Sequence, residues 1–257
     1  MAHAVNGEPG IIAAVRIASM SLSVIVPAFN EEAYLGETLA SINVARAFAS
    51  DESIEVIVVD NASTDRTPLV ATSAGATVVS EPHRNIARAR NRGAARSTGE
   101  TLVFIDADTL VPSEFFARIA EVLRDPVCLG GAADTDYAPK RKIIRAYLQA
   151  WRWIGMFAGI AQGAAQFCRR QAFETLSGYD ESLWMGEDVD FYLRLKKLAK
   201  RSGGGVQFLT DVRVRPSSRR FDRASVAEIL VLTNPLFILM FQRRRSMWKS
   251  WYDEEIR

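Results

Sequence analysis

Three segments of the chain share one pattern, an apolar run that ends abruptly in polar side chains. The runs span about 22–28, 54–59 and 101–105. Apolar runs of this length are typical of strands buried on both faces of a parallel sheet. The carboxyl ends of such strands meet at one sheet edge, so we expect the polar residues that follow them to converge there. These residues are Asn30 and Glu31, Asp60 and Asn61, and Asp106 and Asp108.

Helical periodicity separates these runs. Apolar residues recur at helical spacing over about 32–48, and residues 86–97 are predicted to form a helix with arginines on one side, ended by Gly99. A short strand is expected at 76–80. The alternation of strands and helices predicts an α/β fold with a Rossmann-like, mainly parallel central sheet.

The pattern becomes more varied after Pro112. The expected elements are a helix at 113–124, a strand near 127–134, an aromatic helix at about 139–157, a strand at 162–169, and a helix that starts at Glu187 and stops at Gly203. Three aromatic residues of the long helix fit either core packing or a face that meets a sugar or lipid acceptor. They are Trp151, Trp153 and Phe157.

Length and charge restrict the organisation. A chain of 257 residues with 48% hydrophobic composition, no repeat and no long linker favours one large domain. The net charge of +2 is unevenly distributed, because residues 213–257 carry 10 Lys plus Arg against 5 Asp plus Glu. Such a tail suggests an anionic partner, either a diphosphate or a membrane surface. No nucleic-acid module is evident.

Both cysteines, Cys128 and Cys168, lie in apolar contexts without metal-ligand spacing. We expect buried free thiols, which favours a reducing cytosol. Residues 1–19 lack the pattern of a secretory signal and are expected to be a flexible extension.

Residues 226–241 are strongly apolar but include Glu228, Asn234 and Pro235. A spanning helix needs about 20 apolar residues, so a bent or interfacial helix is expected. The arginines at 243–245, with Trp248 and Trp251, are typical of an anchor at the water boundary of an anionic leaflet. A helix packed on the domain is the competing interpretation. The expected location is cytoplasmic, with peripheral contact at the inner face of the membrane as an open option.

The Asp106-Ala-Asp108 sequence carries the most specific chemistry. Two carboxylates at the end of a strand provide the oxygens that hard divalent cations on phosphates prefer. A solvated loop is the bland alternative for this tripeptide.

Five motifs in order make the chain resemble the family-two glycosyltransferases, inverting enzymes with the glycosyltransferase-A fold. The motifs are Pro27-Ala-Phe-Asn-Glu-Glu32, Val59-Asp-Asn-Ala-Ser-Thr-Asp65, Ala89-Arg-Asn91, Asp106-Ala-Asp108 and Gly186-Glu-Asp-Val-Asp190. The resemblance covers about 22–200. It implies a catalytic domain at 20–222, with a nucleotide-binding half (20–111) and an acceptor-binding half (112–222), followed by a basic and aromatic helical tail at 223–257.

The resemblance also implies roles for particular residues. Asp108 holds Mg²⁺ or Mn²⁺, Asp106 faces the ribose or the outer shell of the metal, and Asp60 hydrogen-bonds the base. Arg90 is either a nucleotide contact or a charge on the helix surface. The remaining nucleotide-binding candidates are Pro27, Ala28, Phe29, Asn30, Glu31 and Asn61.

On the acceptor side, Asp188 is the expected general base, with Glu187 as second choice. Their bland alternative is acidic residues that favour the positive end of a helix dipole. Trp184 and Gly186 are candidates for contacts to the diphosphate or acceptor. So are three arginines expected to clamp the diphosphate from a loop, because guanidinium suits phosphate: Arg215, Arg219 and Arg220.

One feature departs from the family. Several members supply a metal-binding histidine from the region around 215–221, but this chain has only His3 and His83, which leaves a third protein ligand in doubt. The resemblance implies a metal-dependent inverting glycosyltransferase. It would move a sugar from a nucleoside-diphosphate sugar, with UDP favoured, to a sugar or lipid-linked hydroxyl in cell-envelope, polysaccharide or glycolipid synthesis. The alternatives are a sugar nucleotidyltransferase and a non-catalytic nucleotide-sugar-binding domain.

Overall fold

The computed structural model describes residues 19–158 and 163–248, which form one eight-stranded sheet in the order β3-β2-β1-β4-β7-β6-β8-β5. The first half is parallel: β1 (Ser21–Ala28), β2 (Ser53–Asp60), β3 (Thr77–Ser80) and β4 (Thr101–Ile105). In the second half, β7 (Ala165–Arg169) runs antiparallel to β4 and to β6 (Cys128–Thr135). Two strands complete the edge, β8 (Gly205–Pro216), parallel to β6, and β5 (Thr109–Leu110), antiparallel to β8.

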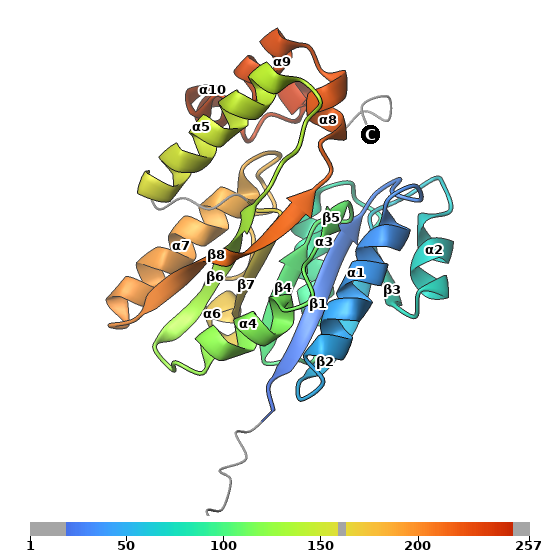
Figure 1. Ribbon diagram of the computed structural model, residues 1–257, viewed down its shortest axis with the longest axis vertical. Helices are drawn as coiled ribbons and strands as arrows, with labels where there is room; N and C mark the ends of the chain where they lie inside the picture. The colour runs from blue at the N-terminus through green and yellow to red at the C-terminus, as the bar shows by residue number, and fades with distance from the viewer. Residues whose placement is uncertain (1–18, 159–162, 249–257) are drawn as a thin grey trace, which may run out of the picture.

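Helices cover both faces of the sheet (Figure 1). One face packs against α1 (Leu35–Phe48), α2 (Thr67–Ser73) and α4 (Phe115–Leu123), and the other against α3 (Ile86–Arg96), α6 (Arg170–Thr175) and α7 (Glu187–Arg201). The apolar run of β1 explains this, because its successive side chains point to opposite faces. Leu22, Val24 and Val26 enter the first core, whereas Ile25 enters the second.

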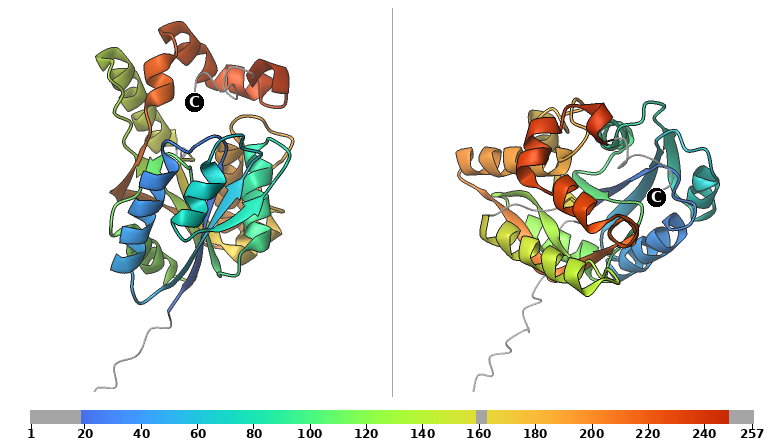
Figure 2. Two further views of the ribbon diagram at one scale, coloured as in Figure 1. Left: turned by 90° about the vertical axis from the view of Figure 1, so that its right-hand side faces the viewer. Right: turned by 90° about the horizontal axis from the view of Figure 1, so that it is seen from above.

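A further layer lies beyond the carboxyl end of β1 and its parallel neighbours (Figures 1 and 2). We call it the helical cap. It comprises residues 142–158 and 219–248, which form α5 (Lys142–Ala158), α8 (Arg219–Arg223), α9 (Val226–Leu232), α10 (Pro235–Phe241) and the 3₁₀ helix η1 (Arg245–Trp248). The cap is tied internally, since the Tyr147 and Thr233 hydroxyls lie 2.6 Å apart.

The predicted bend in the apolar tail is confirmed. The helix ends after Leu232, and a new one starts at Pro235, with the Asn234 side chain accepting hydrogen bonds from the first backbone N–H groups of α10. Proline has no N–H to donate, so it suits the start of the second helix. Among the residues described, no helix is long and apolar enough to cross a membrane.

Other expectations are corrected. Trp248 is fully buried and its ring packs against Phe237 at 5.6 Å, so it is not a side chain at the water boundary. Trp151 and Trp153 are not core residues: Trp151 is half-buried and lines a cavity, and Trp153 is 52% exposed. Cys128 and Cys168 are buried free thiols, as predicted. Residues 1–18 of the expected extension and Trp251 lie outside the described residues.

Candidate active site

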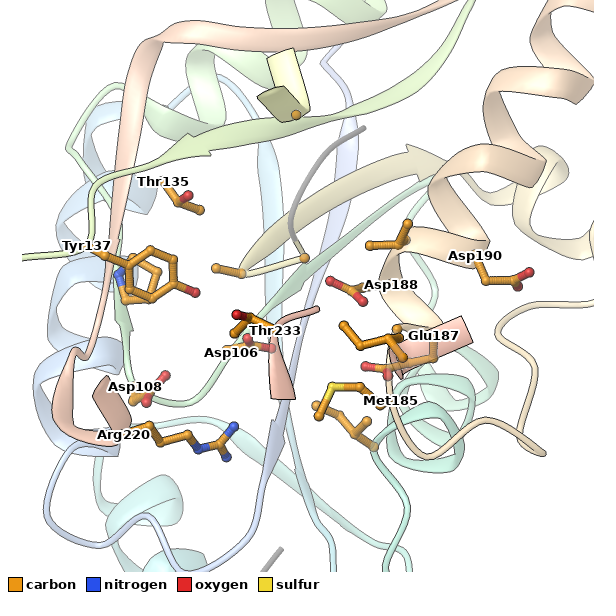
Figure 3. Close-up of a pocket in the computed structure, with 18 of the residues that line it drawn as sticks. Asp106, Asp108, Thr135, Tyr137, Met185, Glu187, Asp188, Asp190, Arg220 and Thr233 are labelled. Carbon is orange, nitrogen blue, oxygen red and sulfur yellow. The ribbon is translucent and has the colours of Figure 1, made fainter. Parts of the chain in front are cut away.

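A cavity of about 600 Å³ lies between the carboxyl edge of the sheet and the helical cap. Its floor carries carboxylates from two separate motifs, and Figure 3 shows Asp106, Asp108 and Asp188 around one space. Asp106 follows β4 directly, and its N–H is held by the carbonyl of Ala164 at 3.1 Å. The end of the apolar strand β4 therefore places Asp106 and Asp108 at the carboxyl edge of the sheet, as the sequence predicted.

Arg90 joins two parts of the site. Its guanidinium donates to Asp106 Oδ1 at 3.0 Å and to Glu187 Oε1 at 2.6 Å, and its side chain is only 3% exposed. The Tyr179 ring lies 5.1 Å from the guanidinium carbon. Arg90 is thus not a charge on the helix surface, because the inner side of α3 turns it into the core between two acids.

The two adjacent acids at the start of α7 differ in their surroundings. Glu187 is buried and held by Arg90. Asp188 is half-buried, lines the cavity, and has no hydrogen-bonding or ion-pair partner for its carboxylate among the described residues. Gly163 lies against it, since a Cβ at position 163 would be 2.2 Å from the Asp188 Cβ. Both acids line the cavity, but the carboxylate of Glu187 is engaged by Arg90, whereas that of Asp188 is the one turned to the open space.

Asp108 has a cationic neighbour. Arg219 Nη2 lies 3.2 Å from Asp108 Oδ2 and 2.5 Å from Glu31 Oε1, and the guanidinium stacks over the Tyr34 ring at 4.2 Å. Two further nitrogens of Arg219, Nε and Nη1, are buried without a hydrogen-bond partner in the described structure. Arg219 thus already neutralises part of the acidic floor, and these nitrogens could donate to an anion.

The other two predicted arginines differ in whether they reach the cavity. Arg220 lines the cavity, and its side chain reaches inward near Asp108 (Figure 3). Arg215 is exposed on β8, where it pairs in register with Leu110, and is not among the lining residues. The alternation of side chains along β8 turns position 215 outward, so the structure does not bring Arg215 to the site.

The loops after β1 and β2, which hold several nucleotide-binding candidates, are joined by hydrogen bonds. The Asn30 N–H donates to Ser63 Oγ at 3.1 Å, and the Thr64 N–H donates to Asn30 Oδ1 at 2.8 Å. Asp60 accepts from the Ser63 N–H at 3.1 Å. Neither Asn30 nor Asp60 is among the residues that line the cavity. Several other nucleotide-binding candidates do line it: Pro27, Ala28, Phe29, Glu31 and Asn61.

The side chain of Asn61 is occupied by backbone contacts. Its amide donates to the carbonyls of Glu81 and His83 at 2.9 and 2.7 Å, and its oxygen accepts from the Asn85 N–H. Asn61 thus fixes the loops that border the cavity, and the residues it ties lead into α3 and Arg90.

Two candidates lie in the segment before Asp188. Trp184 and Gly186 both line the cavity. Gly186 has a φ of +73°, which glycine adopts without the strain of a Cβ, and it immediately precedes α7. This turn sets the direction from which Glu187 and Asp188 enter the site.

Burial and like charge change the acidity of this group. The pKa of Asp106 is raised to about 7, because its deep position and the charges of Asp108 and Asp188 outweigh the attraction of Arg90. Burial likewise raises the pKa of Glu187, against the opposing effect of Arg90. Both shifts disfavour the charged form, so these two carboxyl groups hold their protons to a higher pH than exposed acids do.

The carboxylates of the site can supply only part of the coordination shell of a divalent cation. Asp106 and Asp108 supply hard oxygens, but no group of three or more His, Cys, Asp or Glu with metal-binding geometry exists among the described residues. His83 does not contribute, because it lies among the loops after β3, hydrogen-bonded to Glu81. A cation here would complete its coordination with ligand oxygens such as those of a diphosphate.

Residues 23–176, more than half of the chain, match the sequence pattern described as "Glycosyl transferase family 2". The chain belongs to glycosyl transferase family 2. This confirms the family that the five motifs indicated.

The matches to individual proteins cover only part of each chain. A glucosyl-3-phosphoglycerate synthase of Mycolicibacterium smegmatis is 34% identical over 107 residues, which are 38% of this chain and 34% of that protein. A beta-monoglucosyldiacylglycerol synthase of Synechocystis is 26% identical over 195 residues, 66% of this chain and 39% of that protein. The match thus spans little more than a third of the length of these relatives.

Solved structures of the glycosyltransferase-A type confirm the fold. A mannosyltransferase from Pyrobaculum calidifontis in complex with GDP-Man and Mn²⁺ is 27% identical with a TM-score of 0.61, covering 81% of this chain and 60% of that one. The glucosyl-3-phosphoglycerate synthase of Mycobacterium tuberculosis with Mn²⁺, UDP and glucosyl-3-phosphoglycerate is 20% identical with a TM-score of 0.60, covering 93% and 86%.

Several lining residues of this family-two site were not predicted. Arg84 stacks over the Phe29 ring at 3.6 Å, and Tyr137 packs edge-on against Phe221. Arg152 of α5 pairs with the buried carboxylate of Asp134. The position of Arg152 on the aromatic helix was the one sequence signal among these. Arg84 and Tyr137 reach the cavity from loops whose course depends on the whole fold.

Proposed function

We propose that the chain transfers a sugar from a nucleoside-diphosphate sugar to an acceptor hydroxyl by a single displacement that inverts the anomeric carbon. One observation supports this most strongly. Among the described residues the Asp188 carboxylate has no hydrogen-bond or ion-pair partner, and it faces the Asp106–Asp108 pair across one cavity, while Arg90 holds its neighbour Glu187. Base and leaving group then act on opposite sides of the same carbon.

In this proposal the loops after β1 and β2 bind the nucleoside. Asp60 takes the base, and Phe29 with Arg84 forms a stacked wall of the cavity. UDP is the favoured nucleotide, with guanosine and thymidine donors as alternatives. Arg219 and Arg220 lie beside Asp108 and would bind the diphosphate.

Asp108, with Asp106 beside it, would hold Mg²⁺ or Mn²⁺. When bound, the cation supplies Lewis-acid stabilisation of the charge on the departing diphosphate. Asp188 accepts the proton of the acceptor hydroxyl, and Arg90 keeps Glu187 and Asp106 apart from that step. The acceptor is a sugar or lipid-linked hydroxyl.

The test compares Asp188→Asn with Glu187→Gln in single-turnover transfer. Asp188→Asn should keep nucleotide-sugar binding and lose transfer by about 100- to 10,000-fold, because it removes the proton acceptor with little change in shape. Glu187→Gln should retain more transfer, since the Glu187 carboxylate is engaged by Arg90 and is not the proposed proton acceptor. NMR of the product reads the anomeric configuration.

Near-normal transfer by Asp188→Asn, with collapse in Glu187→Gln, would move the base by one residue. Retention of configuration would rule out the single displacement. The nucleotide itself is identified by thermal shift with UDP, GDP or dTDP, each with and without Mn²⁺, because a ligand of the folded state raises its stability.

A further inference from the structure

Helix α10 is wholly apolar and yet contains no buried residue. Leu236, Leu239 and Met240 are 71%, 67% and 71% exposed. Their i, i+3, i+4 spacing places them on one side of the helix. An exposed apolar face of this kind marks a binding surface more often than a solvated one.

This face continues into the active-site cavity. Leu239 lines the cavity and is also 67% exposed; Ile154 of α5 and Leu193 of α7 combine the same two properties at 53% and 43% exposure. Leu148 and Ile238 add further aliphatic lining. The mouth below the helical cap is therefore apolar, whereas the floor carries the acids.

The helical cap is also strongly basic. Its residues, 142–158 and 219–248, include nine Lys or Arg and two acids, in a chain whose net charge is only +2. Lys142 and Arg145 of α5 and the arginines 243–245 are exposed. Exposed cations on the same cap as an exposed apolar face complement an anionic lipid surface. It does not complement a second copy of the same cap, which would bring like charges together.

Seven helical residues span about 10 Å, far less than the roughly 30 Å of a bilayer core. Helix α10 can therefore lie in the interface but cannot cross it. We propose that the acceptor is an amphipathic lipid of an anionic bilayer. Its hydroxyl reaches Asp188, and its chain leaves between α5, α7 and α10 toward the membrane. This inference rests on the proposed function and specifies its acceptor.

The surface is tested by flotation of the full chain with phosphatidylcholine vesicles, with and without phosphatidylglycerol. Leu236→Ser/Met240→Ser should weaken partitioning onto anionic vesicles by about tenfold or more, because two side chains no longer enter the apolar layer. The matched control is Val44→Ser/Leu69→Ser, which removes apolar residues of 60% and 65% exposure from α1 and α2. Neither pair lines the cavity.

The chain route is tested with diacylglycerol that carries a diazirine on its acyl chain, in the same vesicles. Illumination should label peptides of α5, α7 or α10. Equal loss of flotation in both double variants, absence of binding to anionic vesicles, or label confined to other elements would each overturn the inference. Dimerisation of the chain through α10 would do so too.

Failure of the proposed function gives a different result. In that case no nucleoside diphosphate with Mn²⁺ would raise the melting temperature, whatever the vesicles show. A normal nucleotide shift without vesicle binding would reject the lipid acceptor alone.

Discussion

Arg90 is the residue on which most of the buried charge of the site depends. It faces Asp106 and Glu187 at once, and its side chain and that of Glu187 are 3% and 8% exposed. Removing one partner of a buried ion pair leaves the other charge without compensation, which is much more costly than removing an exposed pair.

We therefore expect Arg90→Met to lower the free energy of unfolding by about 3–5 kcal/mol, measured in urea. Adding Glu187→Gln should recover part of this loss, because no carboxylate is then left uncompensated at that position. Arg92→Met is the control, since Arg92 is an exposed arginine of the same helix, α3. Equal effects of the two arginine substitutions would contradict the buried network.

The sequence could indicate the candidate acids but not which chemical role each of them has. Asp106, Asp108 and Asp188 follow from strand ends and motif order. The sequence leaves Glu187 and Asp188 nearly equivalent, because only the tertiary position of Arg90 shows which carboxylate is engaged. From the sequence, Arg90 is as compatible with a charge on the helix surface as with a nucleotide contact, and only the packing of α3 distinguishes the two.

At the scale of elements, the approach of the segment before β7 to the start of α7 positions the proposed base. Gly163 leaves no room for a side chain, since a Cβ would lie 2.3 Å from Asp188 Oδ2. Gln166 of β7 also holds this region, donating to the Asp188 carbonyl at 3.0 Å. The position of Asp188 is thus set from a strand as well as from its own helix.

Gly163→Ala should displace the Asp188 carboxylate and reduce transfer by about 100-fold, a loss expected for a misplacement near 1 Å. The thermal shift with a nucleoside diphosphate should persist, because the nucleotide loops are on the other side. Gly205→Ala, where a Cβ meets nothing within 4 Å, is the control. Full transfer by Gly163→Ala would show that the contact does not position the base.

The elements themselves were largely predictable, and their directions were not. The helix from Glu187 and the break at Pro235 follow from periodicity and from proline. The antiparallel placement of β7 between β4 and β6 has no sequence signal, because an apolar run reads the same in either direction. The sequence left open whether Trp151 and Trp153 pack in the core or face a ligand, since helical spacing does not say what a helix faces.

At the scale of the whole molecule, the acidic floor links stability to pH. The pKa of Asp106 is about 7 in the folded protein against an ordinary value of 3.8. Between these values the folded state binds more protons than the unfolded chain, so the free energy of unfolding decreases as pH rises.

We expect the melting temperature in EDTA to fall between pH 5 and pH 8 more steeply for the unaltered chain than for Asp106→Asn, which has no proton to lose. Mn²⁺ should oppose the fall at high pH, because metal binding requires the deprotonated acid. Scans of both proteins across this range provide the measurement. A steeper fall in Asp106→Asn would mean that the pKa is not raised.

The tail and the segment before Asp188 are tied together. The Trp184 N–H donates to the Gln242 carbonyl at 2.7 Å, and Arg243 pairs with Asp180 at 2.9 Å. Whatever orders α10 and η1 therefore also orders the approach to α7. Thermodynamic coupling is reciprocal. If binding at the tail raises the affinity for a ligand at Asp188 by some factor, that ligand raises the affinity of the tail for its own partner by the same factor. Ligand occupancy near Asp188 would then change the measured affinity of the tail for its partner, and occupancy at the tail would change the affinity near Asp188.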